Sequence, residues 1–340
     1  MIYTFSNSIL DSLNEQNLDS LDKIWSSSKG RHFLYIDNEP NLRAIQSTYW
    51  FQHLRKSNQA QIEEQFIASA TIPKRLPKFT IAADAHCFSL TEASEILSKH
   101  FTIVLENREY DAHFINAIIN NYKEGQLINE HLKKGWIVYA NGGGSNIPNE
   151  INGMKDRFEK NKTEFPKHSN IYIRAFVIID SDKKYPSIAE VADDKVPLLD
   201  FIKQNAPYHV MLKREMENYL PDEIYNEISR NEDFKKAYIA LNPSQKDYFD
   251  LEKGFPDKNF NQLDVDIQNL YSNINDESKK VFRKEKLTFY KEDDKKDSFK
   301  ARFSRLFLSQ NITKQNLEMR AKSTNENELK EILQKINELL

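Results

Sequence analysis

Hydrophobic residues in the middle of the chain form short runs that alternate with amphipathic segments. Four runs are apolar on both faces, namely FTIVLE (101–106), WIVYANGGG (136–144), NIYIRAFVIID (170–180) and YHVMLK (208–213). Helical spacing of apolar positions is found in the segments 111–125, 146–161 and 187–205. Such an alternation predicts an α/β fold in which a mostly parallel sheet is flanked by helices.

The regions on either side of this segment have different patterns. Short strands are predicted at 31–37 and 78–84, and amphipathic helices at 41–58 and 89–100, the latter with Thr91 as a candidate N-cap. From about residue 221 onward the pattern is helical. We therefore expect an N-terminal α/β region (1–98), a central α/β domain (99–222) and a helical C-terminal region (223–340).

Acidic residues occur where the central strands end. Glu106 ends the first run, and Asp180 and Asp182 close the third. Side chains at positions i and i+2 of an extended backbone point the same way, so the two aspartates can face one point. Ligands of parallel α/β sheets bind at this end of the strands. Clustered carboxylates require a cation, and hard oxygen ligands suit Mg²⁺ or Mn²⁺, which predicts a site able to activate water against a phosphodiester.

Structural interpretations of the same motifs remain open. Asp-Ser-Asp after a strand also suits a turn or a helix N-cap, although the strand-end Glu106 favours a metal site. The glycines at 142–144 could cradle a phosphate or form a tight strand-to-helix turn. No P-loop pattern occurs, so an ATPase site is not expected.

The order strand-Glu, strand-Gly, strand-Asp-x-Asp resembles a Toprim domain, the metal-binding fold of topoisomerases, primases and many nucleases. The segment LKREMENYLP (212–221) is similar to the Leu-Lys-Arg-x-Ile-Glu-Asn-Tyr-Leu segment of the overcoming-lysogenization-defect nucleases and of related stand-alone Toprim nucleases. The resemblance covers about residues 100–222. It implies a Toprim-like, mostly parallel sheet flanked by helices, and the patterns of residues 1–98 and 223–340 add an α/β N-terminal extension and a helical C-terminal region.

The resemblance also implies roles for individual residues. The ligands of Mg²⁺ or Mn²⁺ would be Glu106, Asp111, Asp180, Asp182 and Glu217. The catalytic set would comprise Glu106, Asp180, Asp182 and Glu217 together with Lys213, and either Lys213 or Arg214 would stabilise charge on the phosphate. Toprim domains usually carry Gly after the first Glu, whereas this chain has Asn107, which leaves the local backbone shape open.

In function, the resemblance implies a Mg²⁺-dependent endonuclease that serves as an effector of bacterial anti-phage defence. Its substrate would be nucleic acid, either DNA or RNA such as tRNA. A separate ABC- or SMC-like ATPase, encoded nearby, would hold it inactive, and a homodimer is compatible with this role. The alternative is a non-catalytic Toprim-fold module that binds nucleic acid or a partner. A primase or topoisomerase fragment is disfavoured, because the chain is short for the additional domains.

Composition excludes only a few of the possible functional classes. The net charge of −3 does not indicate a nucleic-acid coat protein, and the single cysteine, Cys87, excludes a disulfide framework and a cysteine-rich zinc site. We expect a soluble, cytoplasmic protein without a membrane-spanning segment. The basic stretch 279–305 could hold nucleic acid, although a solvated helix pair with a Phe core is preferred. The apolar stripe of the last helix is expected to pack on its own domain.

Overall fold

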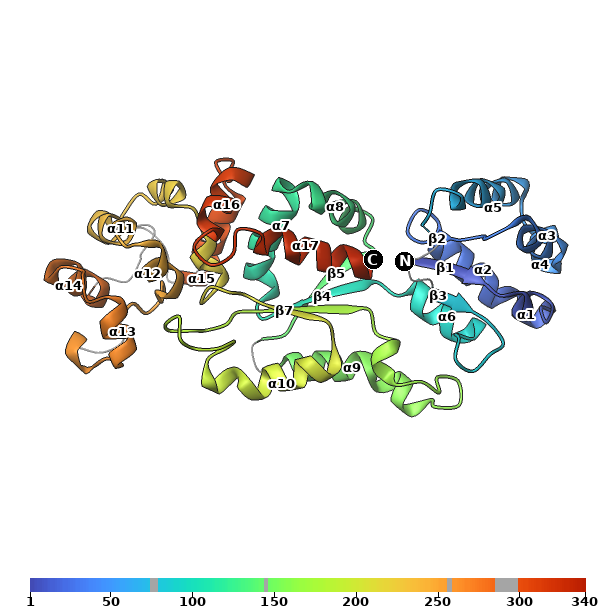
Figure 1. Ribbon diagram of the computed structural model, residues 1–340, viewed down its shortest axis with the longest axis horizontal. Helices are drawn as coiled ribbons and strands as arrows, with labels where there is room; N and C mark the ends of the chain where they lie inside the picture. The colour runs from blue at the N-terminus through green and yellow to red at the C-terminus, as the bar shows by residue number, and fades with distance from the viewer. Residues whose placement is uncertain (74–78, 144–145, 256–258, 285–298) are drawn as a thin grey trace. The chain divides into compact units, whose positions relative to one another are not determined.

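The computed structural model describes residues 1–73, 79–143, 146–255, 259–284 and 299–340. The chain forms two compact units, each with its own sheet (Figure 1). Unit 1 comprises Met1–Phe101, Gly153–Arg174 and Leu339–Leu340, and unit 2 comprises Thr102–Asn152 and Ala175–Glu338. The α/β class with parallel sheets and flanking helices agrees with the sequence. The units differ from the three expected ranges, because the C-terminal helices belong to the same unit as the central sheet.

The sheet of unit 1 has three parallel strands in the order β2-β1-β3. They are β1 (Ile2–Phe5), β2 (Phe33–Leu34) and β3 (Phe79–Ile81). The strands predicted at 31–37 and 78–84 are thus present but shorter. The central strand β1 was not predicted, because its four residues are too few to reveal an alternating pattern.

Two helix boundaries in unit 1 correct the sequence prediction. The helices are α1 (Asn7–Leu10), α2 (Leu18–Ser28), α3 (Glu39–Ser47), α4 (Tyr49–His53), α5 (Lys56–Ser69) and α6 (Leu90–Ser98). The single helix expected at 41–58 is interrupted at Thr48, which has an extended backbone and caps α4 through its side chain. The N-cap of α6 is Ser89 rather than Thr91, because Ser89 and Glu92 form a reciprocal capping box.

The core of unit 1 combines the N-terminal residues with a distant segment. Phe158, Phe165 and Tyr172 are fully buried in the same hydrophobic cluster as Trp25. The ring of Phe158 lies 4.9 Å from the rings of both Phe165 and Tyr172. The buried Glu92 also ties the segments together, since its carboxylate accepts a 2.6 Å hydrogen bond from the Tyr172 hydroxyl. Residues 153–174 are therefore an integral part of this core.

The sheet of unit 2 has the strand order β5-β4-β6-β7. Its strands are β4 (Phe101–Leu105), β5 (Ile137–Asn141), β6 (Ala175–Ile179) and β7 (Tyr208–Val210). β6 is parallel to both β4 and β7, and all five of its residues are buried. All four predicted strands are present. The third begins later than predicted, because residues 169–171 form a 3₁₀ turn.

Helices cover both faces of this sheet: α10 lies on one face and α7, α8 and α17 on the other (Figure 1). The first helices are α7 (Arg108–Asn121), α8 (Gln126–Lys133), α9 (Ile147–Lys160), within which the two units divide, and α10 (Val196–Asn205). The helix predicted at 187–205 forms only from residue 196, with Pro197 in its first turn. The remaining helices are α11 (Glu232–Ile239), α12 (Pro243–Tyr248), α13 (Val265–Leu270), α14 (Asp276–Lys284), α15 (Phe299–Arg305), α16 (Lys314–Ala321) and α17 (Glu328–Leu339).

The last helix packs through the stripe that its sequence predicts. Leu329, Ile332, Leu333 and Ile336 of α17 are fully buried. Packing within the chain's own fold is therefore confirmed for this helix. Over the described parts of the chain, we find no helix with the length and apolar character that a bilayer span requires.

Two glycines of this fold are expected to respond oppositely to substitution by alanine. At Gly125 a Cβ atom would overlap the backbone of Ile119, so Gly125→Ala should destabilise the protein by about 3 kcal/mol. At Gly153, within α9, a Cβ atom meets nothing within 4 Å, so Gly153→Ala should stabilise by about 0.5–1 kcal/mol. Thermal unfolding of the two variants measures both effects, and equal shifts would contradict this packing.

Candidate functional site

The predicted acids lie where the strand order of unit 2 reverses. β4 lies between β5 and β6, so the connection after β4 runs toward β5 and the connection after β6 runs in the opposite direction, toward β7. Glu106 follows β4 directly, and Asp180 follows β6 directly. The carboxyl ends of strands at such a switch point are the usual ligand-binding position of an open parallel sheet.

Backbone hydrogen bonds bring the acids together. The Asp180 N–H donates to Glu106 Oε1 at 2.9 Å, and the Met216 N–H donates to Asp180 Oδ1 at 2.9 Å. The second bond joins the end of β6 to the 3₁₀ turn Met216–Tyr219, which contains the buried Glu217. Residues from three distant parts of the sequence therefore meet at one place, as the strand-end pattern predicts.

Asn107 explains why glycine is not required after Glu106. Its φ is −131°, which any residue can adopt, and its side chain caps α7 by accepting from the N–H groups of Glu109 and Tyr110. The Asn107 N–H in turn donates to the buried Asp111 at 2.7 Å. The backbone shape that the sequence left open is thus a capped helix start, and it fixes Asp111 near Asp180.

The electrostatics of Asp180 reflect this crowding. Burial raises the pKa of Asp180 well above its ordinary value, and the negative charges of Glu106, Asp111 and Glu217 raise it further. Lys195 acts in the opposite direction. The cluster therefore holds more negative charge than its own cation neutralises, which is the condition that a bound divalent cation relieves.

Lys195 is a member of the site that the sequence analysis missed. Its ammonium lies 2.6 Å from Glu106 Oε1 and 2.6 Å from Asp182 Oδ2, and it donates to the Asp180 carbonyl oxygen at 3.1 Å. Burial alone would lower the pKa of Lys195, but the carboxylates of Glu106, Asp180 and Asp182 raise it above its ordinary value. The sequence offers one signal for Lys195, which is its position just before α10. A helix that follows a strand begins near the carboxyl end of that strand, where the acids lie.

Asp182 is the more accessible aspartate of the pair. Its side chain is 33% exposed, whereas Asp180 is 3% exposed. Its φ of 51° lies in the left-handed region, which Asp tolerates better than most side chains. The Asp182 N–H donates to the Arg214 carbonyl oxygen at 2.9 Å, which holds the loop against the segment after β7.

The structure places Lys213 in the protein interior. Lys213 is fully buried, and its ammonium lies 2.5 Å from Asp247 Oδ1 and 2.7 Å from Ser323 Oγ. Arg214 is ion-paired with Asp250 at 2.7 Å. The phosphate contact that the resemblance implies for Lys213 does not fit this placement, because a buried, paired ammonium cannot reach a substrate without breaking the ion pair. The cation nearest the acids is Lys195.

Two further predictions concern the glycines and the basic stretch. Gly142 lies close to the backbone of Leu105 and to Ile147, so it permits a tight turn; Gly144 is outside the described residues. In the basic stretch, residues 285–298 are also outside the described part. Phe282 and Phe303 are buried, which agrees with the preferred Phe core.

The donor set agrees with the expected metal in ligand type. Carboxylate oxygens of Glu106, Asp180, Asp182 and Glu217 are hard ligands of the type that Mg²⁺ and Mn²⁺ prefer. Within the described residues, no three Asp, Glu, His or Cys side chains are already arranged as a coordination shell. The ammonium of Lys195 instead bridges two of the carboxylates. The set fits a divalent cation in charge and ligand type, provided that Lys195 moves aside.

Comparison with known proteins finds no match for this chain. It matches no protein-family model, no curated protein and no solved structure. The interpretation of the acidic site therefore depends on its own residues.

Proposed function

We propose that this protein is a Mg²⁺- or Mn²⁺-dependent nuclease of the Toprim type that hydrolyses phosphodiester bonds. The observation that carries the proposal is the convergence of Glu106, Asp180 and Glu217 at the switch point of a parallel sheet. The unrelieved negative charge around Asp180 supports it. A stable fold gains little from such a cluster, which is why clusters of this kind are found mainly at functional sites.

The position of each acidic side chain determines its proposed role. Glu106 is oriented by the Asp180 N–H and Asp180 by the Met216 N–H, so both carboxylates are fixed before any ligand binds. Asp182, the more exposed carboxylate, is open to substrate and solvent. A divalent cation held by this set would polarise the phosphodiester and lower the pKa of an attacking water.

The resemblance extends the proposal to a biological role. Nucleases similar in the strand-end acids and the LKREMENYLP segment act in bacterial anti-phage defence, so we infer an effector of such a system. Its substrate would be DNA or RNA, including tRNA, and an ABC- or SMC-like ATPase would regulate it. Incubation of the purified protein with labelled DNA and RNA in Mn²⁺ tests the activity. Cleavage that persists in excess EDTA would refute metal dependence.

Lys195 provides a second test. We expect Lys195→Met to bind Mn²⁺ roughly tenfold more tightly than wild type, because the ammonium competes with the cation for Glu106 and Asp182. Lys184→Met is the matched control, since Lys184 is an exposed lysine that also lies between β6 and α10. Isothermal titration measures both variants. An equal effect of the two substitutions, or a weaker affinity in Lys195→Met, would contradict direct competition.

A second candidate function is a non-catalytic module that binds nucleic acid or a partner. The observation that favours it is the pair of 2.6 Å contacts of Lys195, through which the chain supplies its own cation to Glu106 and Asp182. In that case neither wild type nor Lys195→Met would bind Mn²⁺, while nucleic-acid or partner binding would persist. This result would replace the nuclease proposal.

A further inference from the structure

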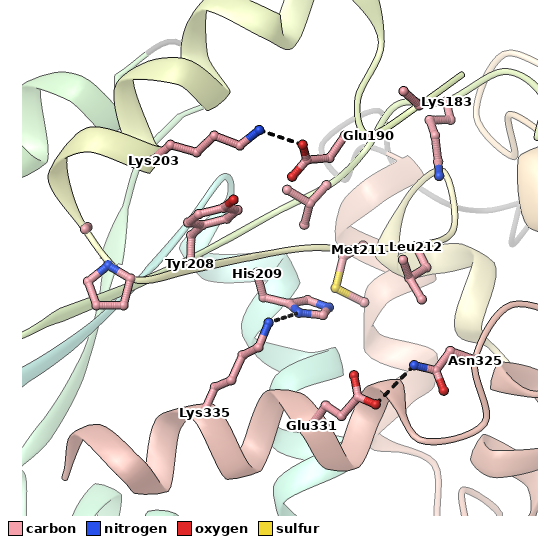
Figure 2. A pocket seen from close by; sticks show the side chains of 14 residues that line it. Lys183, Glu190, Lys203, Tyr208, His209, Met211, Leu212, Asn325, Glu331 and Lys335 are labelled. Carbon is pink, nitrogen blue, oxygen red and sulfur yellow. Dashed lines mark hydrogen bonds and ion pairs between the residues drawn. The ribbon is translucent and has the colours of Figure 1, made fainter. Parts of the chain in front are cut away.

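A pocket of about 760 Å³ lies in unit 2 between β7, the loop after β6 and α17 (Figure 2). Its size is within the usual range of small-molecule sites. Its charged and titratable lining residues are Lys183, Glu190, Lys203, His209, Glu331 and Lys335. Three lysines thus face two glutamates, so the lining favours an anion.

Lys183 is the residue that distinguishes this pocket from an ordinary surface hollow. It is only 7% exposed, yet it lines the pocket, into which its side chain points (Figure 2). Among the described residues, no carboxylate lies within ion-pair distance of its ammonium, which lies 5.9 Å from the centroid of the Tyr248 ring. A buried ammonium without an anion is costly, and a ligand phosphate would provide its missing partner.

Lys335 offers a second ammonium from the opposite wall. It reaches from α17 to His209 and donates to Nδ1 at 3.3 Å (Figure 2). An ammonium can only donate, so Nδ1 accepts and the Nε2–H of His209 donates to Glu328 at 3.1 Å. Glu328 also accepts from the Leu212 N–H at 2.8 Å and from the Tyr219 hydroxyl. The Glu328 carboxylate is therefore hydrogen-bonded inside the protein and forms no ion pair with Lys335. The positive charge of Lys335 is available to a ligand.

The other charged groups leave this excess in place. Lys203 is ion-paired with Glu190 at 2.6 Å, so these two charges compensate each other. Glu331 accepts a 3.2 Å hydrogen bond from the neutral amide of Asn325 and keeps its negative charge, so the lining retains an excess of one positive charge. Lys183 and Lys335 therefore remain as the two cations without a carboxylate partner among the described residues.

The remaining walls are apolar and include an aromatic ring. Pro207, Met211 and Leu212 contribute aliphatic surface, and the half-buried Tyr208 contributes its ring. A ligand that suits both parts has a planar apolar moiety and a terminal phosphate. A terminal phosphate reaches a buried ammonium more readily than the diester of a polynucleotide, which is flanked by sugar on both sides.

We propose that this pocket binds a nucleotide, with its phosphates between Lys183 and Lys335 and its base against the apolar wall. None of the five acidic residues of the proposed metal site lines the pocket, although Lys183 directly follows Asp182. The proposal does not depend on the proposed nuclease activity. The chain has no P-loop motif, and the proposal concerns nucleotide binding alone.

Titration of the full-length protein with adenosine 5′-triphosphate tests the proposal, with EDTA present so that the acidic cluster holds no metal. We expect Lys183→Met and Lys335→Gln each to weaken binding roughly tenfold, because each removes a charge-assisted contact. The control Lys184→Met removes the same charge from the neighbouring exposed position and should change affinity less than about twofold. Lys335 is exposed on α17, so its variant should fold even if Lys183→Met does not.

Three results would overturn the proposal. The first is no binding by the wild-type protein at millimolar nucleotide. The second is an equal loss in Lys184→Met and Lys335→Gln, which would indicate nonspecific attraction. The third is competition by single-stranded oligonucleotide at lower concentration than the nucleotide, which would assign the pocket to nucleic acid. Pyrophosphate and adenosine are titrated separately, and both should bind more weakly than the nucleotide that joins them.

Discussion

Asp180→Asn should abolish metal-dependent cleavage of nucleic acid while the protein becomes more resistant to heat. Loss of one of the converging carboxylates should lower the rate by at least about 10³-fold. The amide is nearly isosteric and its oxygen can still accept from the Met216 N–H, so the fold is retained. Cleavage assays in Mn²⁺ and thermal unfolding without metal measure the two effects.

The stability gain follows from the sign of the pKa shift. Burial and the charges of Glu106 and Asp111 raise the pKa of Asp180 in the folded protein above the unfolded value of 3.8. The protonated carboxyl group of Asp180 therefore stabilises the folded protein at low pH. This contribution is lost as the pH rises through the pKa that Asp180 has in the folded protein. Above that value a neutral amide should raise the melting temperature by roughly 2–5 °C. Mn²⁺ should raise the melting temperature of wild type but not of the variant.

Glu190→Gln is the matched control for this experiment. Glu190 is an exposed carboxylate of the loop after β6, and it lies outside the acidic cluster. It should leave both the cleavage rate and the effect of Mn²⁺ unchanged. Undiminished cleavage by Asp180→Asn would refute the site, and a lower melting temperature would contradict the repulsion between Asp180 and the neighbouring carboxylates.

The largest loss of stability is expected from Asp247→Ala. The Asp247 carboxylate is 1% exposed and lies 2.5 Å from both the Lys213 ammonium and an Arg320 guanidinium nitrogen. Its removal leaves two buried cations without their shared anion, which should lower the free energy of unfolding by about 3–5 kcal/mol. Urea titration monitored by circular dichroism measures this change.

The pH dependence of the same variant offers an independent check. Burial and the nearby Arg320 lower the pKa of Lys213 to about 8 from its ordinary 10.5, although Asp247 opposes the shift. The unfolded chain thus binds more protons than the folded one over this interval, so stability rises with pH. Without Asp247 the folded pKa of Lys213 falls further, so the variant starts to gain stability at a lower pH than wild type and should recover part of its loss as the pH rises toward about 8.

Glu318→Ala is the control for the buried ion pair. Glu318 pairs with Lys314 at 3.4 Å, and both side chains are about half exposed. Exposed pairs contribute about 0–1 kcal/mol, so this substitution should have little effect. A loss in Asp247→Ala no larger than that in Glu318→Ala would show that the interior network contributes little.

The strand-end acids could be predicted because they depend on a simple rule of chain direction. Once four apolar runs alternate with helices, Glu106 and Asp180 must lie at the same edge of a parallel sheet. Asn107 shows the limit of this reasoning: the sequence identifies an unusual residue after Glu106, but only the structure reveals that its side chain caps α7.

The lysines could not be assigned from the sequence alone. Lys183, Lys195 and Lys213 are all near the predicted acids in sequence, yet they have three different environments. Lys213 is drawn inward by Asp247, which follows it by 34 positions, and no local pattern reports such a pairing. The environment of a long, flexible side chain depends on tertiary contacts, whereas the position of a strand end depends on local periodicity.

The interleaving of the two units limits how the protein can be dissected. A fragment ending at residue 98 would lack Phe158, Phe165 and Tyr172, and would leave the rest of their hydrophobic cluster incomplete. During synthesis this cluster cannot be completed until residues 153–174 have left the ribosome, by which time all of β4 and β5 have already emerged. The N-terminal region should therefore complete its folding late, and chaperones would bind its exposed hydrophobic residues before its core is complete.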